Sequence, residues 1–229
     1  MQTVLNFPSL LQHTFIVGAY CSGKDLLAVY AIKNIKQQRP SLKVYVIDIK
    51  GYPTESHYYA NADFLRIKNS SNVASQEDVA ELVSWIQHCF NEFESLEGEK
   101  LLVLSESTLV FHFFAQNKSN RTWLSNKIIS YLCLGNASGI YIWLIGPSFN
   151  IQETLISRQF WVLVNLILIV GQENTTLYHY ILSTDFLPKN CQPSTENIKE
   201  IASQSPVKRA VYFNGEWLPM PRLDFERFS

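Results

Sequence analysis

The chain has 229 residues, a formal net charge of −1 at pH 7, and a composition that is 47% hydrophobic and 17% charged. This length and apolar content suffice for one substantial core, so the sequence predicts a single domain over residues 1–229 and excludes an intrinsically disordered chain. The near-zero net charge also excludes a uniformly basic surface of the kind that binds nucleic acid mainly through its phosphates.

The first motif along the chain is a phosphate-binding loop. Residues Gly18 to Lys24 read G-A-Y-C-S-G-K, which has the spacing G-x-x-x-x-G-K. The apolar run His13 to Val17 predicts a strand before it, and the apolar period of Asp25 to Lys36 predicts a helix after it. This context favours nucleotide binding over the alternative, an ordinary glycine-containing turn. The expected nucleotide contacts are Gly18, Ala19, Tyr20, Cys21, Ser22, Gly23, Lys24, Asp25 and Leu26.

The segments that follow predict alternating strands and helices. Strands are expected at Lys43 to Ile49 and Phe64 to Ile67, and a capped helix is expected from Ser75 toward Phe93. The apolar run Phe160 to Val170 is too short to span a bilayer and predicts a buried central strand. The alternation of strands and helices predicts an α/β layer structure with a largely parallel sheet. Since the most apolar run is too short to cross a bilayer, we expect no membrane span.

The strand predicted at Leu101 to Glu106 ends in polar residues. In P-loop ATPases such a strand is expected beside the P-loop strand, where it delivers a metal-holding acid and a glutamate that polarises the attacking water. Ser105 stands in the first position and Glu106 in the second, so Glu106 and Lys24 are the expected catalytic residues. The alternative is a core strand whose end carries Ser and Glu by chance.

A later segment, Leu134 to Ser148, resembles the FtsK/HerA branch of P-loop motors, whose corresponding segment reads G-R-A-A-G-I-H and continues into a strand. Ile47 to Gly51 looks like the I-D-P-K-G segment of that branch, the P-loop is similar to its G-A-T-G-S-G-K-S, and Lys208 to Glu216 looks like its terminal hairpin. The matching positions in the first segment are Gly135, Ala137, Gly139 and Ile140.

The resemblance implies a three-layer RecA-like P-loop NTPase fold with a mainly parallel central sheet and a C-terminal β-hairpin. It implies ATP and Mg²⁺ as cofactors, DNA as a partner, and assembly into a homo-oligomeric ring or with partner proteins.

The departures from this branch fall on residues with chemical roles. Asp25 replaces the hydroxyl that ligates Mg²⁺, and Ser105 replaces the acid at the end of the strand. Asn136 replaces an arginine that acts on a neighbour's γ-phosphate, and Pro147 replaces a phosphate-sensing glutamine. The candidates to replace the arginine, each more simply explained as a surface charge, are Arg121 and Arg158.

Asp25 and Ser105 suggest an exchange of metal ligands between the loop and the second strand. If those strands are neighbours, as expected, a carboxylate and a hydroxyl would face one Mg²⁺ from exchanged sides. The charge of Asp25 beside phosphates opposes this exchange, and the alternative is a decayed metal site.

Three other stretches have open interpretations. The aromatic residues of Gly51 to Tyr59 suit stacking on single-stranded DNA, although packing against the domain is more common. The apolar cluster Phe111 to Phe114 suits either a subunit interface or the core. Basic residues that suit DNA in a ring pore, or simply an exposed helix face, are Lys118, Arg121 and Lys127.

The four cysteines indicate a reducing compartment. They stand at positions 21, 89, 133 and 191, with neither a C-x-x-C pair nor a Cys/His metal spacing. The first residues, M-Q-T-V-L-N-F-P, lack the basic and apolar regions of a signal peptide. We therefore expect free thiols and a cytoplasmic location.

Three functions follow from these observations. The first is an ATP-binding FtsK/HerA-like motor that acts on DNA in translocation, packaging or plasmid transfer, and thus a possible ATPase. The second is a catalytically degenerate P-loop protein that serves as a structural or regulatory subunit. The third, a small-molecule kinase, shares the loop but gains no support from the later segments.

Overall fold

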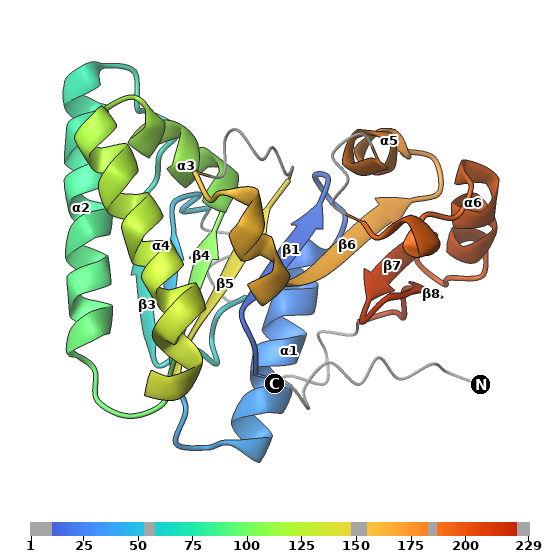
Figure 1. Cartoon of the computed structure of the whole chain (residues 1–229), viewed down its shortest axis with the longest axis horizontal. Helices are drawn as coiled ribbons and strands as arrows, with labels where there is room; N and C mark the ends of the chain where they lie inside the picture. Colours follow the sequence, from blue (N-terminus) through green and yellow to red (C-terminus); the bar gives the residue numbers. More distant parts are fainter. Residues whose placement is uncertain (1–10, 53–57, 148–154, 183–186, 224–229) are drawn as a thin grey trace.

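The computed structural model describes residues 11–52, 58–147, 155–182 and 187–223, and its strands form one eight-stranded sheet between helices (Figure 1). The strands are β1 (Thr14–Gly18), β2 (Lys43–Asp48), β3 (Phe64–Ile67), β4 (Lys100–Ser105), β5 (Ile140–Gly146), β6 (Asn165–Gly171), β7 (Arg209–Phe213) and β8 (Glu216–Pro219). The helices are α1 (Lys24–Gln38), α2 (Gln76–Ser95), α3 (Ser107–Ala115), α4 (Lys118–Ser138), α5 (Thr176–Leu182) and α6 (Thr195–Ser203), with 3₁₀ turns η2 (Arg158–Leu163) and η3 (Lys189–Cys191).

The strand order is β3-β2-β4-β5-β1-β6-β7-β8, and every pairing from β3 through β6 is parallel. Strands β7 and β8 add an antiparallel hairpin at one edge. Its turn residues Asn214 and Gly215 have φ of 50° and 87°, the left-handed pair that a tight hairpin turn with the twist of its strands requires. The predicted α/β fold with a mainly parallel sheet and a C-terminal hairpin is confirmed.

The expectation that the P-loop strand and the Ser105 strand are neighbours was wrong. Strand β5 pairs with β1 on one side and with β4 on the other. The chain leaves β4, passes through α3 and α4, and returns as β5 in the position between the two strands. Because adjacent strands lie about 4.8 Å apart, β5 places roughly 10 Å between β1 and β4. Any contact between the loop and Ser105 or Glu106 therefore comes from the residues that follow β1, not from β1 itself.

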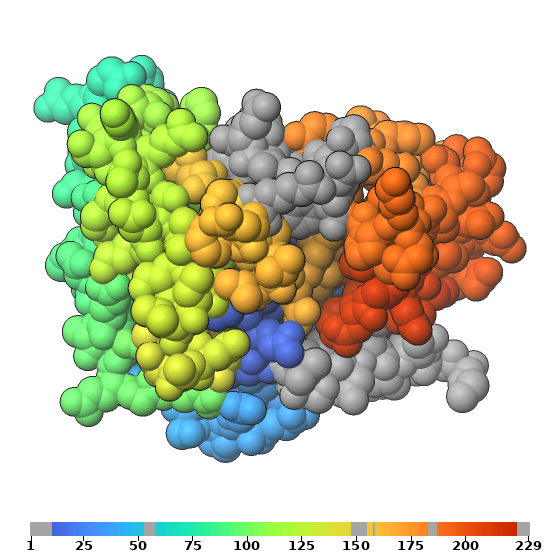
Figure 2. Space-filling model, viewed as in Figure 1, coloured from blue at the N-terminus to red at the C-terminus, as the bar shows by residue number. Residues whose placement is uncertain are grey.

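Helices cover both faces of the sheet. Alternate residues of β1 point to opposite faces, so Phe15 and Val17 pack with α2, α3 and α4 while Ile16 packs with α1. Figure 2 shows α2 and α4 at one end of the long axis and the C-terminal elements, from α5 through β8, at the other. The result is the predicted three-layer arrangement.

Of two elements predicted from local sequence patterns, the capped helix α2 is confirmed, whereas the run Phe160 to Val170 is a strand only in part. Helix α2 has the predicted capping box, in which the Ser75 hydroxyl accepts from the Asp78 backbone N–H and the Asp78 carboxylate accepts from the Ser75 N–H. The run Phe160 to Val170 is only partly a strand, because its first residues form η2, closed by a hydrogen bond from the Val164 N–H to the Trp161 carbonyl. Strand β6 begins at Asn165 and lies beside β1, as a central strand should.

The structure also decides between interpretations left open. Phe111, Phe113 and Phe114 are buried, so this cluster belongs to the core. All four cysteines are free thiols, as predicted. No helix within the described ranges is long and apolar enough to cross a membrane. The N-terminal octapeptide examined for a signal sequence lies outside the described residues.

Residues assigned to DNA contacts lie in different surroundings. Lys118 and Arg121 are exposed at the N-terminus of α4, whereas the Lys127 ammonium pairs with Glu94 at 2.6 Å. Within Gly51 to Tyr59, residues 53–57 are outside the described part. At its ends Tyr52 is exposed, while Tyr59 is buried.

Candidate functional site

The loop from Gly18 to Lys24 joins β1 to α1 and is closed by a hydrogen bond from the Ser22 N–H to the Ala19 carbonyl. A Cβ at Gly18 would lie 2.3 Å from the Ser22 Oγ and 3.0 Å from the Ser22 Cβ, so a larger residue here would displace the Ser22 side chain. Gly23, the N-cap of α1, has φ of 84°, which L residues adopt at a cost. The loop is thus folded tightly against the N-terminus of a fifteen-residue helix, where unpaired N–H groups favour anions.

The nine residues expected to bind nucleotide occupy this loop and the first turn of α1. Lys24 is 3% exposed, although it carries the charge expected to meet phosphates. Tyr20 is 77% exposed, and its ring centroid lies 5.6 Å from the Lys24 ammonium. Cys21 is exposed with a left-handed φ of 59°, and Ser22 is buried. The half-buried members are Ala19, Gly23, Asp25 and Leu26.

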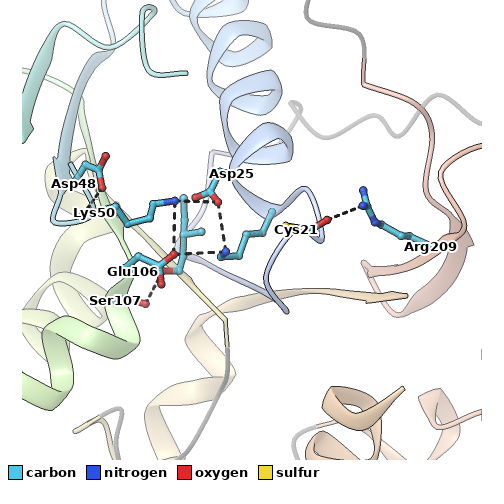
Figure 3. Close-up of polar contacts among 9 residues, drawn as sticks. Cys21, Asp25, Asp48, Lys50, Glu106, Ser107 and Arg209 are labelled. Carbon is cyan, nitrogen blue, oxygen red and sulfur yellow. Dashed lines mark hydrogen bonds and ion pairs between the residues drawn. The ribbon is translucent and has the colours of Figure 1, made fainter. Parts of the chain in front are cut away.

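Two lysines and two carboxylates meet beside the loop (Figure 3). The Lys24 ammonium lies 3.4 Å from Asp25 Oδ2 and 3.6 Å from Glu106 Oε1. The Lys50 ammonium lies 3.2 Å from the same Asp25 oxygen and 3.6 Å from the same Glu106 oxygen. We call these four residues the charge cluster. It brings the two expected catalytic residues together despite the strand between β1 and β4.

Glu106 has an unusual backbone. It is the N-cap of α3 and has φ of 54° and ψ of 43°, a left-handed conformation that costs a non-glycine residue about 1–3 kcal/mol. Burial raises the pKa of the Glu106 carboxyl above its usual range, while Lys24 and Lys50 lower it and Asp25 raises it. A strained, buried carboxylate beside a phosphate-binding loop has the position of a group that accepts a proton from, or orients, a water molecule.

Several buried oxygen atoms at this edge of the sheet have no hydrogen-bond partner among the described residues. They are Asp25 Oδ1, Ser105 Oγ, Glu106 Oε1, Ser22 Oγ and the Tyr59 hydroxyl. Burial raises the pKa of Tyr59 well above its usual range, and the charge of Asp25 raises it further, while the Ser105 hydroxyl lowers it. Tyr59 is therefore a neutral phenol.

These oxygen atoms fit a Mg²⁺ ion. Mg²⁺ binds to carboxylate, hydroxyl and phosphate oxygens, and a P-loop site supplies few protein ligands because phosphates and water complete the shell. Asp25 offers Oδ1 while its Oδ2 contacts the lysines, and Ser105 offers its hydroxyl. Within the described ranges, no group of three or more His, Cys, Asp or Glu side chains could hold a metal ion.

The C-terminal hairpin also reaches the loop. The Arg209 Nη2 donates a hydrogen bond of 2.6 Å to the Cys21 carbonyl, as Figure 3 shows. Gly23 lies beneath the same guanidinium, since a Cβ there would be 3.2 Å from Arg209 Nη1. This contact joins residues 188 positions apart and holds a basic group over the loop.

The remaining departures lie away from the charge cluster. Asn136 is exposed near the end of α4, and Pro147 is half-buried just after β5. Of the residues considered as substitutes for the missing arginine, Arg121 is exposed on α4, and the side chain of Arg158 is outside the described part of the structure. Among the contacts of the described residues, none joins Asn136 or Arg121 to the charge cluster.

The sequence interpretation did not assign three residues to this site. Lys50 was recognised only as part of a motif after β2, because its position near Glu106 depends on the pairing of β2 with β4, which the sequence does not show. Arg209 was recognised only as part of the hairpin. Tyr59 carried no local sign, because its burial depends on packing against segments distant in the sequence.

Neither a protein-family model nor a curated protein matches the chain. Solved structures do. The conjugation coupling protein TcpA of pCW3, in monomer form with ATPγS, is 15% identical with a TM-score of 0.55, and the match covers 95% of this chain and 62% of TcpA. The genome packaging NTPase B204 of Sulfolobus turreted icosahedral virus 2 is 14% identical in complex with sulfate, with a TM-score of 0.52 over 93% of this chain and 98% of B204. With ATPγS, B204 is 12% identical with a TM-score of 0.50.

These similarities concern the fold, since identity is low, and the chain spans less than two thirds of the TcpA structure. The neighbours are FtsK/HerA-type P-loop NTPases, and the chain shares their RecA-like fold.

Proposed function

We propose that this protein binds ATP at the P-loop and hydrolyses it as an FtsK/HerA-like motor acting on DNA, with residues 1–229 as one nucleotide-binding unit. The observation that carries the proposal is the buried Lys24 ammonium, which lies at the N-terminus of α1 and 3.6 Å from Glu106. A buried lysine and a buried carboxylate at a phosphate-binding loop are costly to maintain without a function that uses them.

In this proposal each residue has one role. The loop backbone and the N-terminus of α1 bind the phosphates, and Lys24 neutralises the β and γ oxygens. Glu106 orients the attacking water and accepts its proton, which its raised pKa favours. Mg²⁺, held by Asp25 and Ser105, would supply positive charge to the phosphate oxygens when bound.

The proposals that the protein acts on DNA and assembles into an oligomer rest on analogy with the structural neighbours. One neighbour is named a conjugation coupling protein and the other a genome packaging NTPase. By analogy, we propose that this protein acts on DNA as a homo-oligomeric ring. Because every copy carries Asn136, the arginine that acts on a neighbour's γ-phosphate would have to come from another position, for which Arg121 and Arg158 are the candidates.

The test is ATP hydrolysis by the purified protein with and without double-stranded DNA, together with its mass in solution with Mg-ATP. The proposal predicts turnover that DNA increases and that Lys24→Ala abolishes, in an oligomer. Lys68→Ala is the matched control, because the Lys68 ammonium pairs with Glu81 at 2.7 Å on the surface. ATP binding without turnover, with or without DNA, would instead indicate a structural or regulatory subunit.

A further inference from the structure

Lys50 is held at the edge of the loop by the turn that follows β2. Its backbone N–H donates a hydrogen bond of 2.9 Å to the Asp48 carboxylate. The next residue, Gly51, has φ of 59°, and a Cβ there would lie 3.0 Å from the Asn69 backbone. The turn therefore requires glycine and directs the Lys50 side chain, 12% exposed, toward the site from the β2 side.

Lys50 lies where its positive charge can offset the repulsion between the Asp25 carboxylate and the nucleotide phosphates. A carboxylate next to the P-loop lysine repels phosphates, and Lys24 alone cannot offset both Asp25 and Glu106. The Lys50 ammonium lies 3.2 Å from Asp25 and 3.6 Å from Glu106. With Lys50 present, the charge cluster holds two positive and two negative groups when both carboxyls are ionised.

We propose that Lys50 is a second phosphate-binding lysine, which neutralises Asp25 and contacts the nucleotide phosphates from the side opposite the loop. The proposal rests on nucleotide binding at the P-loop. In this arrangement Asp25 Oδ2 holds the lysines while Oδ1, which has no hydrogen-bond partner among the described residues, remains available to a metal. Asp25 and Lys50 together replace the single hydroxyl of an ordinary P-loop.

The experiment measures ATP affinity in EDTA, where charge acts without Mg²⁺, for Lys50→Met, Asp25→Asn and the double variant. Lys50→Met should weaken binding about ten- to hundredfold, the loss expected for a charge-assisted contact. Asp25→Asn should tighten binding about three- to tenfold, because it removes one of the two negative charges beside Lys24 and Lys50. The double variant should bind with an affinity between those of Lys50→Met and the wild type, since removing the charge of Asp25 offsets only part of the lost contact between Lys50 and the phosphates.

Two controls make the result specific. Lys50→Arg keeps the charge and should retain most of the affinity, and Lys68→Met makes the same chemical change at a surface ion pair and should change nothing. If Lys50→Met binds as tightly as Lys68→Met, Lys50 has no role at the phosphates. If Lys50→Met fails to fold, Asp25→Asn decides, and the absence of tighter binding contradicts the proposal.

The failure of the inference is distinguishable from the failure of the proposed function. If the wild type binds ATP and Lys24→Ala does not, the nucleotide site stands, and only the result for Lys50 decides this inference. If the wild type binds no ATP, both proposals are overturned.

Discussion

Glu106 combines a strained backbone with a buried charge. Its backbone is left-handed, its carboxylate is buried, and both lysines of the charge cluster lie 3.6 Å from its Oε1. Strain and buried charge together reduce stability, and their presence at one position supports the proposed role of Glu106 in hydrolysis.

Glu106→Gln tests this role at the residue scale. The amide keeps the size of the side chain but cannot accept a proton, so hydrolysis should fall by about 10²- to 10⁴-fold while ATP affinity stays within a few-fold of the wild type. The measurement is single-turnover hydrolysis together with calorimetric binding. Turnover at the wild-type rate would remove Glu106 from the mechanism.

Other residues at the site were partly predictable. The spacing of the loop predicted Lys24, the first residue of α1, and the apolar strand that precedes Glu106 predicted that residue, because both signals lie in neighbouring residues. Lys50, Tyr59 and Arg209 were not assigned, because their contacts with the site depend on the order of strands and on packing across the sheet. The sequence alone does not specify either.

At the scale of elements, the last turns of α4 carry a glycine, Gly135, because the backbone there lies close to Ile140 and His13. A Cβ at Gly135 would lie 2.3 Å from the Ile140 carbonyl oxygen and 3.0 Å from His13 Cε1. The His13 Nδ1 in turn accepts a hydrogen bond from the Ile142 N–H. The segment that resembles the FtsK/HerA branch therefore preserves the close packing of α4, β1 and β5.

Gly135→Ala should lower the free energy of unfolding by about 1–2 kcal/mol. The clash with backbone costs about 1–3 kcal/mol, and the higher helix propensity of alanine offsets up to about 1 kcal/mol. Gly171→Ala is the matched control, since the nearest atom to its Cβ would be 3.9 Å away. Urea unfolding of both variants is the measurement, and equal stability would contradict the close approach at Gly135.

His13 makes the same junction sensitive to pH. Burial lowers the pKa of His13 from 6.5 to about 4, so the unfolded chain binds a proton between these values while the folded protein does not. The stability that depends on neutral His13 is present above pH 6.5 and is lost as the pH falls toward 4. The expected loss over this interval is about 3 kcal/mol.

The measurement is urea unfolding from pH 7 to pH 4, with His13→Asn compared with the wild type. The variant should lose less stability on acidification, because asparagine does not titrate. His88→Asn, at an exposed histidine of α2 that lies 3.4 Å from Glu92, should keep the wild-type dependence. If His13→Asn follows the wild type at every pH, His13 does not cause the acid sensitivity.

Elements were predicted well where the pattern was local. Strand β3 was predicted at its observed bounds, and α2 begins at its predicted cap, because both depend on neighbouring residues. The first residues of the run Phe160 to Val170 were wrongly predicted as strand, because an apolar run alone does not distinguish a strand from a short helical turn. The position of β5 was missed because strand order is not local.

At the scale of the whole molecule, the parallel sheet gathers the site. Strands β1, β2 and β4 all end at the same edge, so the loop after β1, Lys50 after β2 and Glu106 after β4 meet there. The C-terminal hairpin reaches the same loop through Arg209. The arrangement agrees with the general rule that ligands bind at the carboxyl ends of parallel strands.

Nucleotide binding by the P-loop is the central claim, and one calorimetric titration tests it. Mg-ATP is titrated into the wild type, Lys24→Ala and the surface control Lys68→Ala, with folding checked by circular dichroism. We predict saturable binding by the wild type and the control, and affinity weakened about a hundredfold or more in Lys24→Ala. No binding by the wild type, or equal binding by Lys24→Ala, would contradict the account.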